Sequence, residues 1–214
     1  MPSNTAHVAN ALQEYNSAIF NVEQKLAQDR SLHMHELTNA YMEAVKADMP
    51  HSYLDMMESV ISNRSTFNDR KTALDAMEWG MHDAKLKKAL GANRGVLSGG
   101  ATAISGHASS RAFEYAGARS NAMLYNMHRK LAHDRSLHTQ ELENCYAEAV
   151  KLAGGSTNAR AFSEMLGNMV LDRRTFNARK TALDAGQWAQ VEAAVQAAGA
   201  GKLLSAGAYR QKKH

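Results

Sequence analysis

The chain has 214 residues, of which 44% are hydrophobic and 21% are charged, as is typical of a globular protein with a substantial core. Part of its formal net charge of +4 lies in the tail Arg210–His214, so the charge alone does not indicate a nucleic-acid partner. The single cysteine, Cys145, excludes an internal disulfide and favours a reducing compartment. The lack of any run of about 20 apolar residues excludes a conventional membrane-spanning helix.

The first predicted element is one long helix. Only two prolines occur in the whole chain, and neither proline nor glycine occurs between Ser3 and Met49, so a helix can continue until Pro50 ends it. Its apolar residues alternate steps of four and three, which is typical of a helix that packs lengthwise on other helices. This apolar seam consists of Val8, Leu12, Tyr15, Ile19, Val22 and Leu26.

Two shorter helices are predicted next. The first lies near Tyr53–Ile61. The second has Ser65 or Thr66 as its N-cap, since both residue types accept a hydrogen bond from the first turn of a helix. It runs to about Leu90, where Gly91 is predicted to stop it.

A glycine-rich segment follows, and it has two interpretations. Small residues at steps of four would line one face of a helix and let a second helix approach closely. The same composition also suits a flexible linker. We favour either of these interpretations over insertion of the segment into a membrane. The residues with this spacing are Gly91, Gly95, Gly99 and Ala103.

The strongest feature of the sequence is a tandem duplication. The segment Asn21–His33 recurs as Asn126–His138 with nine of 13 positions identical, and Thr66–Ala76 recurs as Thr175–Ala185. Equivalent residues are 105 positions apart in the first block and 109 in the second, so the second copy carries four extra residues. We place this insertion near Gly154–Thr157, as a loop lengthened between two helices.

These observations predict an all-α fold. It is a tandem duplication of a three-helix unit with one long helix per copy, arranged as a helical bundle or an array of hairpins. The second copy should contain helices ending near Leu152, near Ala161–Leu171, and from Thr175 to about Ala198. The predicted domains are helical repeat 1 (1–92), a Gly/Ser/Ala-rich linker or helix seam (93–108), and helical repeat 2 with a basic tail (109–214).

Polar residues stand where the apolar seam of each copy would continue. In both copies an Asp, a His and a Glu at positions i, i+4 and i+7 share one helix face, so their side chains can converge. A metal or acid–base site is one hypothesis, because imidazole and carboxylate groups bind iron, zinc or manganese. The Glu-x-x-His element of di-iron bundles is absent, however. The six residues are Asp29, His33, Glu36, Asp134, His138 and Glu141.

The favoured hypothesis for this polar set is a structural layer that holds no cofactor. Asp29 or Glu36 would then pair with Arg30 or with a neighbouring helix, and His33 would be hydrogen-bonded. Buried polar layers of this kind can fix register and partner choice. In a third hypothesis the seam shifts and leaves the polar set exposed, the new seam being Met34, Leu37 and Tyr41.

Two basic pairs also recur. At helical spacing they are typical of a solvated face on which Lys71 pairs with Asp75 and Lys180 with Asp184. The alternative is a nucleic-acid-binding surface whose phosphate contacts come from Arg70, Lys71, Arg179 and Lys180. The nearby aromatic residues are predicted to anchor the core, and they are Phe67, Trp79, Phe176 and Trp188.

A resemblance accompanies these patterns. The stretch Gly95–Ala118, in which a small-residue run passes into Ser109–Gly117, is similar to a pattern common in internal virion proteins of short-tailed bacteriophages. The resemblance implies a small helical protein that is ejected with the genome and helps to form a conduit across the host envelope. It brings no catalytic residues.

We therefore expect a non-enzymatic, self-associating helical protein, and the resemblance makes it a virion component for DNA ejection. Its partners would be copies of itself or other helical proteins, with nucleic acid and transient membrane contact as alternatives. Because Met1–Thr5 lacks the basic and apolar regions of a signal peptide, we expect it in the cytoplasm or the virion interior. A metal-binding or metalloenzyme bundle and a nucleic-acid-binding module are the competing functions.

Overall fold

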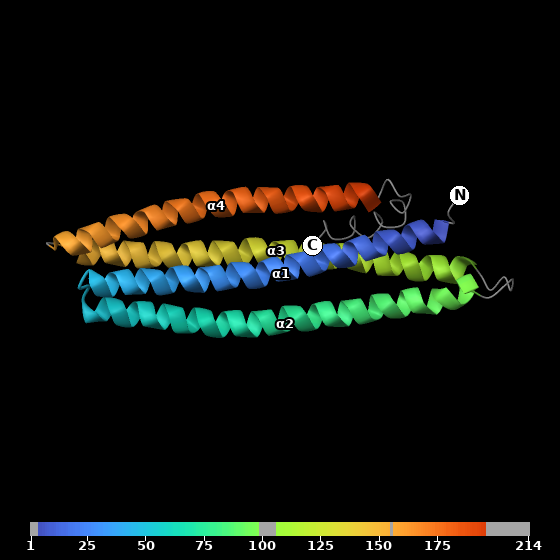
Figure 1. The fold of residues 1–214 in the computed structure, drawn as a ribbon, viewed down its shortest axis with the longest axis horizontal. Helices are drawn as coiled ribbons and strands as arrows, with labels where there is room; N and C mark the ends of the chain where they lie inside the picture. Colours follow the sequence, from blue (N-terminus) through green and yellow to red (C-terminus); the bar gives the residue numbers. More distant parts are fainter. Residues whose placement is uncertain (1–3, 99–105, 155, 196–214) are drawn as a thin grey trace, which may run out of the picture. The chain divides into compact units, whose positions relative to one another are not determined.

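The computed structural model describes residues 4–98, 106–154 and 156–195, with side chains over 12–88, 116–154 and 156–193. Within these residues the chain forms helices and no strand, which confirms the all-α prediction and the duplicated arrangement (Figure 1). Each repeat is a pair of long helices. The first pair is α1 (Asn4–Lys46) and α2 (His51–Ser98), and the second is α3 (Gly106–Leu152) and α4 (Thr157–Val195).

Each repeat therefore has two helices and not the three that we predicted. In each repeat the predicted short helix and the predicted third helix form one continuous helix. The threonine that was predicted as an N-cap makes a different hydrogen bond. The Thr66 hydroxyl donates to the Ser62 carbonyl at 3.1 Å, and the Thr175 hydroxyl donates to the Leu171 carbonyl at 3.0 Å. A hydroxyl that bonds to the carbonyl four residues back is compatible with a helix interior.

Gly91 does not end α2, which continues to Ser98. Glycine inside a helix costs only about 1 kcal/mol relative to alanine, and no proline follows to break the helix. Both Gly91 and Gly95 thus lie in α2, whereas Gly99 and Ala103 lie outside the described residues, so the small-residue seam stays a prediction. The predicted linker 93–108 overlaps the end of α2 and the start of α3.

The turn between α1 and α2 is a Schellman motif. The Met49 N–H donates to the Ala44 carbonyl and the Asp48 N–H to the Val45 carbonyl, both at 3.1 Å. Asp48 adopts the left-handed conformation (φ 54°) that this motif requires. Pro50 follows, so the chain leaves α1 where the sequence predicted.

The four extra residues of the second repeat lie at the α3–α4 connection, as predicted, but they do not lengthen it. Four residues separate the two helices in either repeat. The insertion is taken up by the helices, since α3 ends one residue beyond the equivalent of Lys46 and α4 begins three residues before the equivalent of His51. Ser156 caps α4, because its hydroxyl oxygen accepts from the Ala159 N–H at 3.4 Å.

The helices contribute to two compact units. Unit 1 comprises Met1–Glu23, Asp75–Arg129 and Asp184–His214, and unit 2 comprises Gln24–Leu74 and Lys130–Leu183. Each unit takes segments from both repeats, so the compact units do not coincide with the predicted domains 1–92 and 109–214.

Unit 1 contains the first part of the predicted apolar seam. Leu12, Tyr15, Ile19 and Val22 are all buried, as the spacing of four and three predicted. Burial, with the nearby Glu192, raises the pKa of Tyr15 to about 12. The side chain of Val8 lies outside the described residues.

Unit 2 holds both helix turns, and they lie at the same end of it (Figure 1). The core beside the turns is built from both repeats, so each hairpin covers the apolar face of the other. The Tyr53 hydroxyl donates to the Cys145 carbonyl across the repeats at 3.0 Å. No stretch of the described helices has the combined length and apolarity needed to traverse a bilayer. The fully buried members of this core are Leu37, Ala40, Ala44, Tyr53, Met57, Leu142, Cys145, Ala149 and Leu166.

Candidate functional site

A buried polar layer crosses unit 2, where the two repeats meet. Asp29 and Asp134 are buried, and His33 and His138 have no solvent exposure at all. The hypothesis that the seam shifts and leaves these residues exposed is therefore wrong. Leu37 is also fully buried, whereas Met34 and Tyr41 of the alternative seam are half-buried. The buried face of α1 therefore includes Asp29, His33 and Leu37.

Two reciprocal ion pairs form the centre of the layer. The Arg30 Nε donates to Asp134 Oδ2 at 2.8 Å, and the Arg135 Nε donates to Asp29 Oδ2 at 2.7 Å. Asp29 is equivalent to Asp134, and Arg30 is equivalent to Arg135. Each repeat therefore contributes one aspartate and one arginine, and both pair with the opposite repeat. The prediction that Asp29 pairs with a neighbouring helix fits this geometry. Its partner is the arginine of the opposite repeat.

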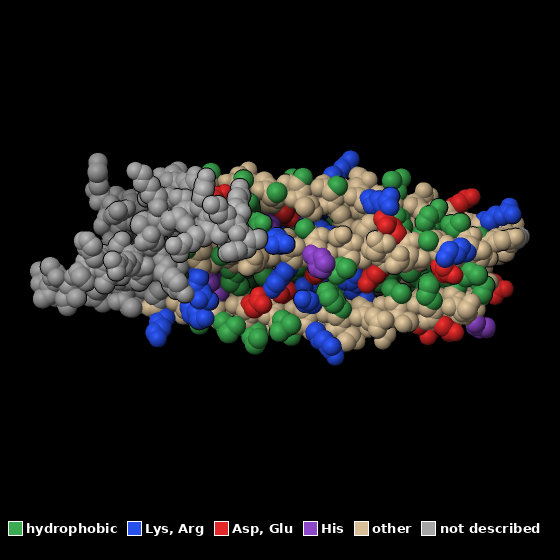
Figure 2. Space-filling view, turned by 180° about the vertical axis from the view of Figure 1, so that it is seen from behind, with side chains coloured by type: hydrophobic (Ala, Val, Ile, Leu, Met, Phe, Trp, Pro, Cys, Tyr) green, Lys and Arg blue, Asp and Glu red, His purple; other side chains and the backbone are tan. Residues whose placement is uncertain are grey.

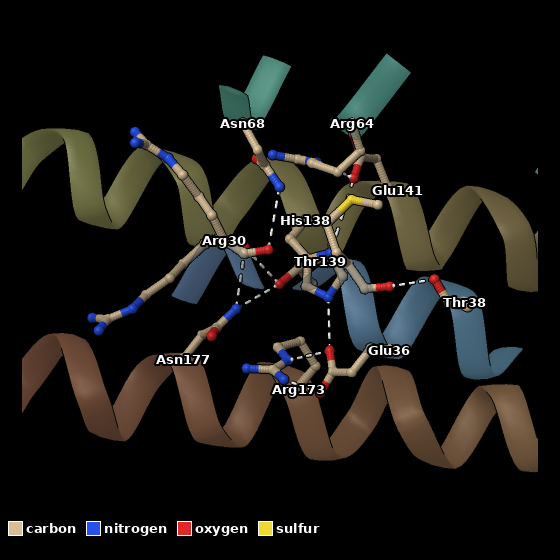
Figure 3. A network of polar contacts seen from close by, with 12 residues as sticks. Arg30, Glu36, Thr38, Arg64, Asn68, His138, Thr139, Glu141, Arg173 and Asn177 are labelled. Atoms are coloured by element: carbon tan, nitrogen blue, oxygen red, sulfur yellow. Dashed lines mark hydrogen bonds and ion pairs between the residues drawn. The ribbon is translucent and has the colours of Figure 1, made fainter. Parts of the chain in front are cut away.

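The helices of each hairpin support these arginines in matching ways. The Nη1 of Arg30 donates to the Thr72 hydroxyl at 3.1 Å, and the Nη1 of Arg135 donates to the Thr181 hydroxyl at 3.3 Å. A buried asparagine from the same hairpin donates to the backbone carbonyl of each arginine. These bonds are Asn68 to Arg30 at 3.2 Å and Asn177 to Arg135 at 3.1 Å (Figure 3).

A second pair of reciprocal ion pairs lies beside the first. The Arg64 Nε on α2 donates to Glu141 Oε2 on α3 at 2.8 Å. The Arg173 Nε on α4 donates to Glu36 Oε2 on α1 at 3.0 Å, and the other end of this guanidinium also contacts Glu36 (Figure 3). The arginines are buried and the carboxylates are partly exposed.

The two histidines stack between these ion pairs. Their ring centroids are 3.9 Å apart and their planes differ by 12°. The His138 Nε2 lies 2.7 Å from Glu36 Oε2 (Figure 3), whereas neither ring nitrogen of His33 has a hydrogen-bond partner in the described part of the chain. The expectation that His33 is hydrogen-bonded is therefore wrong. Glu141, the equivalent of Glu36, is bound by Arg64 and lies 3.9 Å from the Nδ1 of His138.

Burial keeps both imidazoles neutral. Desolvation, with the nearby His138 and Arg173, lowers the pKa of His33 to about 2. Desolvation also lowers the pKa of His138, although the Glu141 carboxylate acts in the opposite direction. A neutral His138 can donate its Nε2 proton to the Glu36 carboxylate, so the short contact is an ordinary hydrogen bond to an anion.

The six predicted metal ligands are brought to one layer, but they are not arranged as a ligand set. Arginines bind all four carboxylates, and the imidazoles face each other. Among the described residues no group of three or more His, Cys, Asp or Glu side chains is placed to hold a metal ion. The geometry is that of a structural polar layer.

The basic pairs are not members of this layer, although Lys71 shares the Phe67 ring with Arg64 and Lys180 shares the Phe176 ring with Arg173. Arg70 and Arg179 are exposed. Lys71 and Lys180 lie over the rings of Phe67 and Phe176, at 5.7 and 5.9 Å from the ring centres. Asp75 and Asp184 are buried, so they do not lie on a solvated face, and the pairing of Lys71 with Asp75 and of Lys180 with Asp184 stays a prediction.

The aromatic residues are not the core anchors that we predicted. Trp79 and Trp188 are half-buried in unit 1, where Trp79 packs on Phe20 at 5.1 Å and Trp188 on Tyr125 at 6.0 Å between ring centroids. Phe176 is 38% exposed. The rings lie at the edge of the apolar face, where an aromatic side chain can also stack on a cation.

One pair that resembles a catalytic dyad lies in unit 1. The His82 Nε2 is 3.2 Å from the Ser120 Oγ, and both side chains are buried. The Ser120 hydroxyl donates to the Ala116 carbonyl at 2.9 Å, so its oxygen accepts from His82. In this arrangement the serine proton points to a backbone carbonyl and away from the histidine, and the pair links α2 to α3.

Sequence reasoning missed the residues of α2 and α4 that complete the layer, namely Arg64, Asn68, Thr72, Arg173, Asn177 and Thr181. The signal that could have found them is the duplication. They occur at equivalent positions, 109 apart, in or just before the second repeated block. Searches for a matching protein-family model, curated protein or solved structure find none.

Proposed function

We propose that this chain is a non-enzymatic helical structural protein that associates with further copies of itself. The observation that carries the proposal is a set of exposed apolar side chains at equivalent positions of the two repeats. Pairing the residues by the duplication gives Phe20 with Tyr125, Val45 with Val150, and Leu74 with Leu183, and each is between 40% and 63% exposed.

Single exposed apolar residues are common on protein surfaces, but here the same positions are exposed and apolar in both repeats. Leu183 is the most exposed of these six residues, at 63%, and its equivalent Leu74 is 47% exposed. Three exposed methionines add flexible apolar surface that suits association with other helices, and they are Met42, Met77 and Met81. On the face drawn in Figure 2, hydrophobic side chains lie among side chains of both charges.

The buried polar groups also support a structural role. In unit 2 the carboxylates of the polar layer are bound by arginines, and in unit 1 the Ser120 proton is held by a backbone carbonyl. The ion pairs hold helices of the two repeats together, and the Ser120 hydroxyl bonds within α3, so each of these groups is already engaged in a contact that supports the fold.

The finer proposal is an internal virion or DNA-ejection component of a short-tailed bacteriophage. It is supported by the sequence resemblance of Gly95–Ala118 and by the long helices. A vesicle-leakage assay on the purified protein tests it: leakage that grows with protein concentration supports a conduit, and intact vesicles at every concentration count against one.

The test of self-association is native mass as a function of concentration. We expect a defined oligomer in the wild type and a smaller species when Leu74→Glu and Leu183→Glu are combined. The matched control combines Ala73→Glu with Ala182→Glu, which places the same charges on adjacent exposed residues of the same helices. A wild type that is monomeric at all concentrations contradicts the proposal.

A further inference from the structure

The contacts between the repeats in unit 2 have the reciprocity of a twofold axis. Residue i of one repeat contacts residue j of the other, and the equivalent of j contacts the equivalent of i, as in an interface between identical subunits. This holds for Asp29 with Arg135 and Arg30 with Asp134. It also holds for Glu36 with Arg173 and Arg64 with Glu141, and the stacked rings of His33 and His138 lie between the two sets.

We propose that this interface is self-complementary, so that either repeat can pair with the same repeat of a second copy of this chain. In a pairing of two first repeats, Asp29 of one chain meets Arg30 of the other, and Glu36 meets Arg64. Every charge keeps a partner of the type that it has within one chain, because the equivalent residues are identical.

The differences between the repeats support this inference. Apolar positions of the shared core differ in residue type, namely Ala40 from Cys145, Tyr53 from Phe162, and Met57 from Leu166. The charged groups of the layer are the same in both repeats. Cores tolerate hydrophobic exchanges of similar volume, whereas a buried charge without a partner is strongly destabilising, so the layer decides which surfaces can pair.

The inference rests on the proposed function in one respect, because both name a second copy of this chain as the binding partner. The surfaces differ, however. The proposed association uses exposed side chains such as Leu74 and Leu183, whereas the inferred pairing of repeats uses groups that are buried within each chain.

The experiment exchanges the two central charges of repeat 1 in the full chain. With Asp29→Arg and Arg30→Asp together, the new arginine faces Arg135 and the new aspartate faces Asp134, so pairing within the chain becomes repulsive. Pairing of two first repeats from different chains is attractive again, and pairing of two second repeats is unchanged. We expect the native mass to rise from that of a single chain, 23.4 kDa, to twice that value or to longer strings.

The matched control makes the same exchange in both repeats, adding Asp134→Arg and Arg135→Asp. Pairing within the chain is then attractive, and the mass should return to that of a single chain. All variants carry Leu74→Glu and Leu183→Glu, which removes the proposed outer association. A folded monomer from the first exchange, or a control that keeps the doubled mass, overturns the inference.

A second measurement decides the matter if the first exchange only unfolds the protein. Isotope-labelled and unlabelled chains that carry only Leu74→Glu and Leu183→Glu are unfolded together and refolded at high concentration. Native mass spectrometry should find dimers of one labelled and one unlabelled chain that persist on dilution. The inference is overturned if such mixed dimers are absent or if no dimers form.

The two proposals can fail separately. If wild-type chains associate while the exchange leaves a folded monomer, the proposed function stands and the inference is lost. If wild-type chains stay monomeric while the exchange doubles the native mass, the inference stands and the proposed function is lost.

Discussion

The imidazole rings of His33 and His138 stack at 3.9 Å between centroids, although 105 residues separate them in the sequence. They occupy equivalent positions of the two repeats, yet only His138 contacts a carboxylate. The polar layer is therefore reciprocal in its four ion pairs and asymmetric at its histidines. Both properties lead to measurable consequences.

The first consequence concerns pH. The pKa of each histidine is lower in the folded protein than the value near 6.5 expected in the unfolded chain. Between these values the unfolded state binds more protons, so the free energy of unfolding falls as the pH falls below about 6.5. The slope is up to about 1.4 kcal/mol per pH unit for each histidine. For His33 the window extends down to about pH 2.

Urea unfolding at pH 7.5, 6 and 5 measures this slope. The combined variant His33→Gln and His138→Gln should show a flatter dependence over the same range. His82 remains as a further contributor in both proteins, because burial lowers its pKa too. Equal slopes for the wild type and the variant would show that the histidines titrate normally in the fold.

The second prediction compares the two histidines directly. His138→Met removes the hydrogen bond to Glu36, whereas His33→Met removes a ring whose nitrogens have no hydrogen-bond partner among the described residues. Either change loses the ring stacking, so the difference isolates the hydrogen bond. Because a hydrogen bond to a charged group contributes about 1.5–3 kcal/mol, His138→Met should destabilise the protein more, by roughly that amount. Thermal unfolding of both variants decides the order.

The third prediction concerns the central ion pairs. Asp134→Ala removes the buried carboxylate that the Arg30 guanidinium binds at 2.8 Å, and the free energy of unfolding should fall by about 3–5 kcal/mol. The control is Glu43→Ala, which breaks the exposed pair with Lys46 and should cost less than about 1 kcal/mol. Replacing both members of the buried pair, with Arg30→Met and Asp134→Leu, should recover much of the loss. A small effect of Asp134→Ala would mean that the layer is solvated.

The fourth prediction tests whether α2 is continuous. Thr66→Pro should cost about 3 kcal/mol or more, because proline breaks the interior of a helix. If Ser65 were an N-cap, proline at position 66 would be the first helical residue and would be tolerated. His51→Pro is the control at the true first residue of α2 and should be nearly neutral. Circular dichroism and thermal unfolding of the two variants distinguish the alternatives.

The fifth prediction uses the helical glycines. A methyl group at Gly80 or Gly186 would meet no atom within 4 Å apart from its chain neighbours and the nearby backbone of its own helix, so Gly80→Ala and Gly186→Ala should each raise the free energy of unfolding by up to about 1 kcal/mol. At Gly167 the same group would lie 3.0 Å from the Tyr146 ring, which must shift. Gly167→Ala should therefore gain less or destabilise. An equal gain at all three positions would show that Tyr146 moves freely.

The sequence by itself determined the helical class, the duplication and the buried face of α1. Apolar spacing in steps of four and three identifies which side of a helix is buried, and Leu12, Tyr15, Ile19, Val22 and Leu26 are buried accordingly. The same spacing of four and three residues placed Asp29, His33 and their equivalents in the second repeat on that buried face. These results depend only on the geometry of one helix, which the local sequence contains.

Only the tertiary structure decided which groups meet on that face. The central ion pairs join residues 104 and 106 positions apart, and no local spacing specifies such a partner. It also decided that Thr66 lies inside a helix, since packing along the whole of α2 outweighs the N-cap preference of one residue. Periodicity fixes the direction of a side chain, whereas its partner depends on how helices distant in sequence pack together.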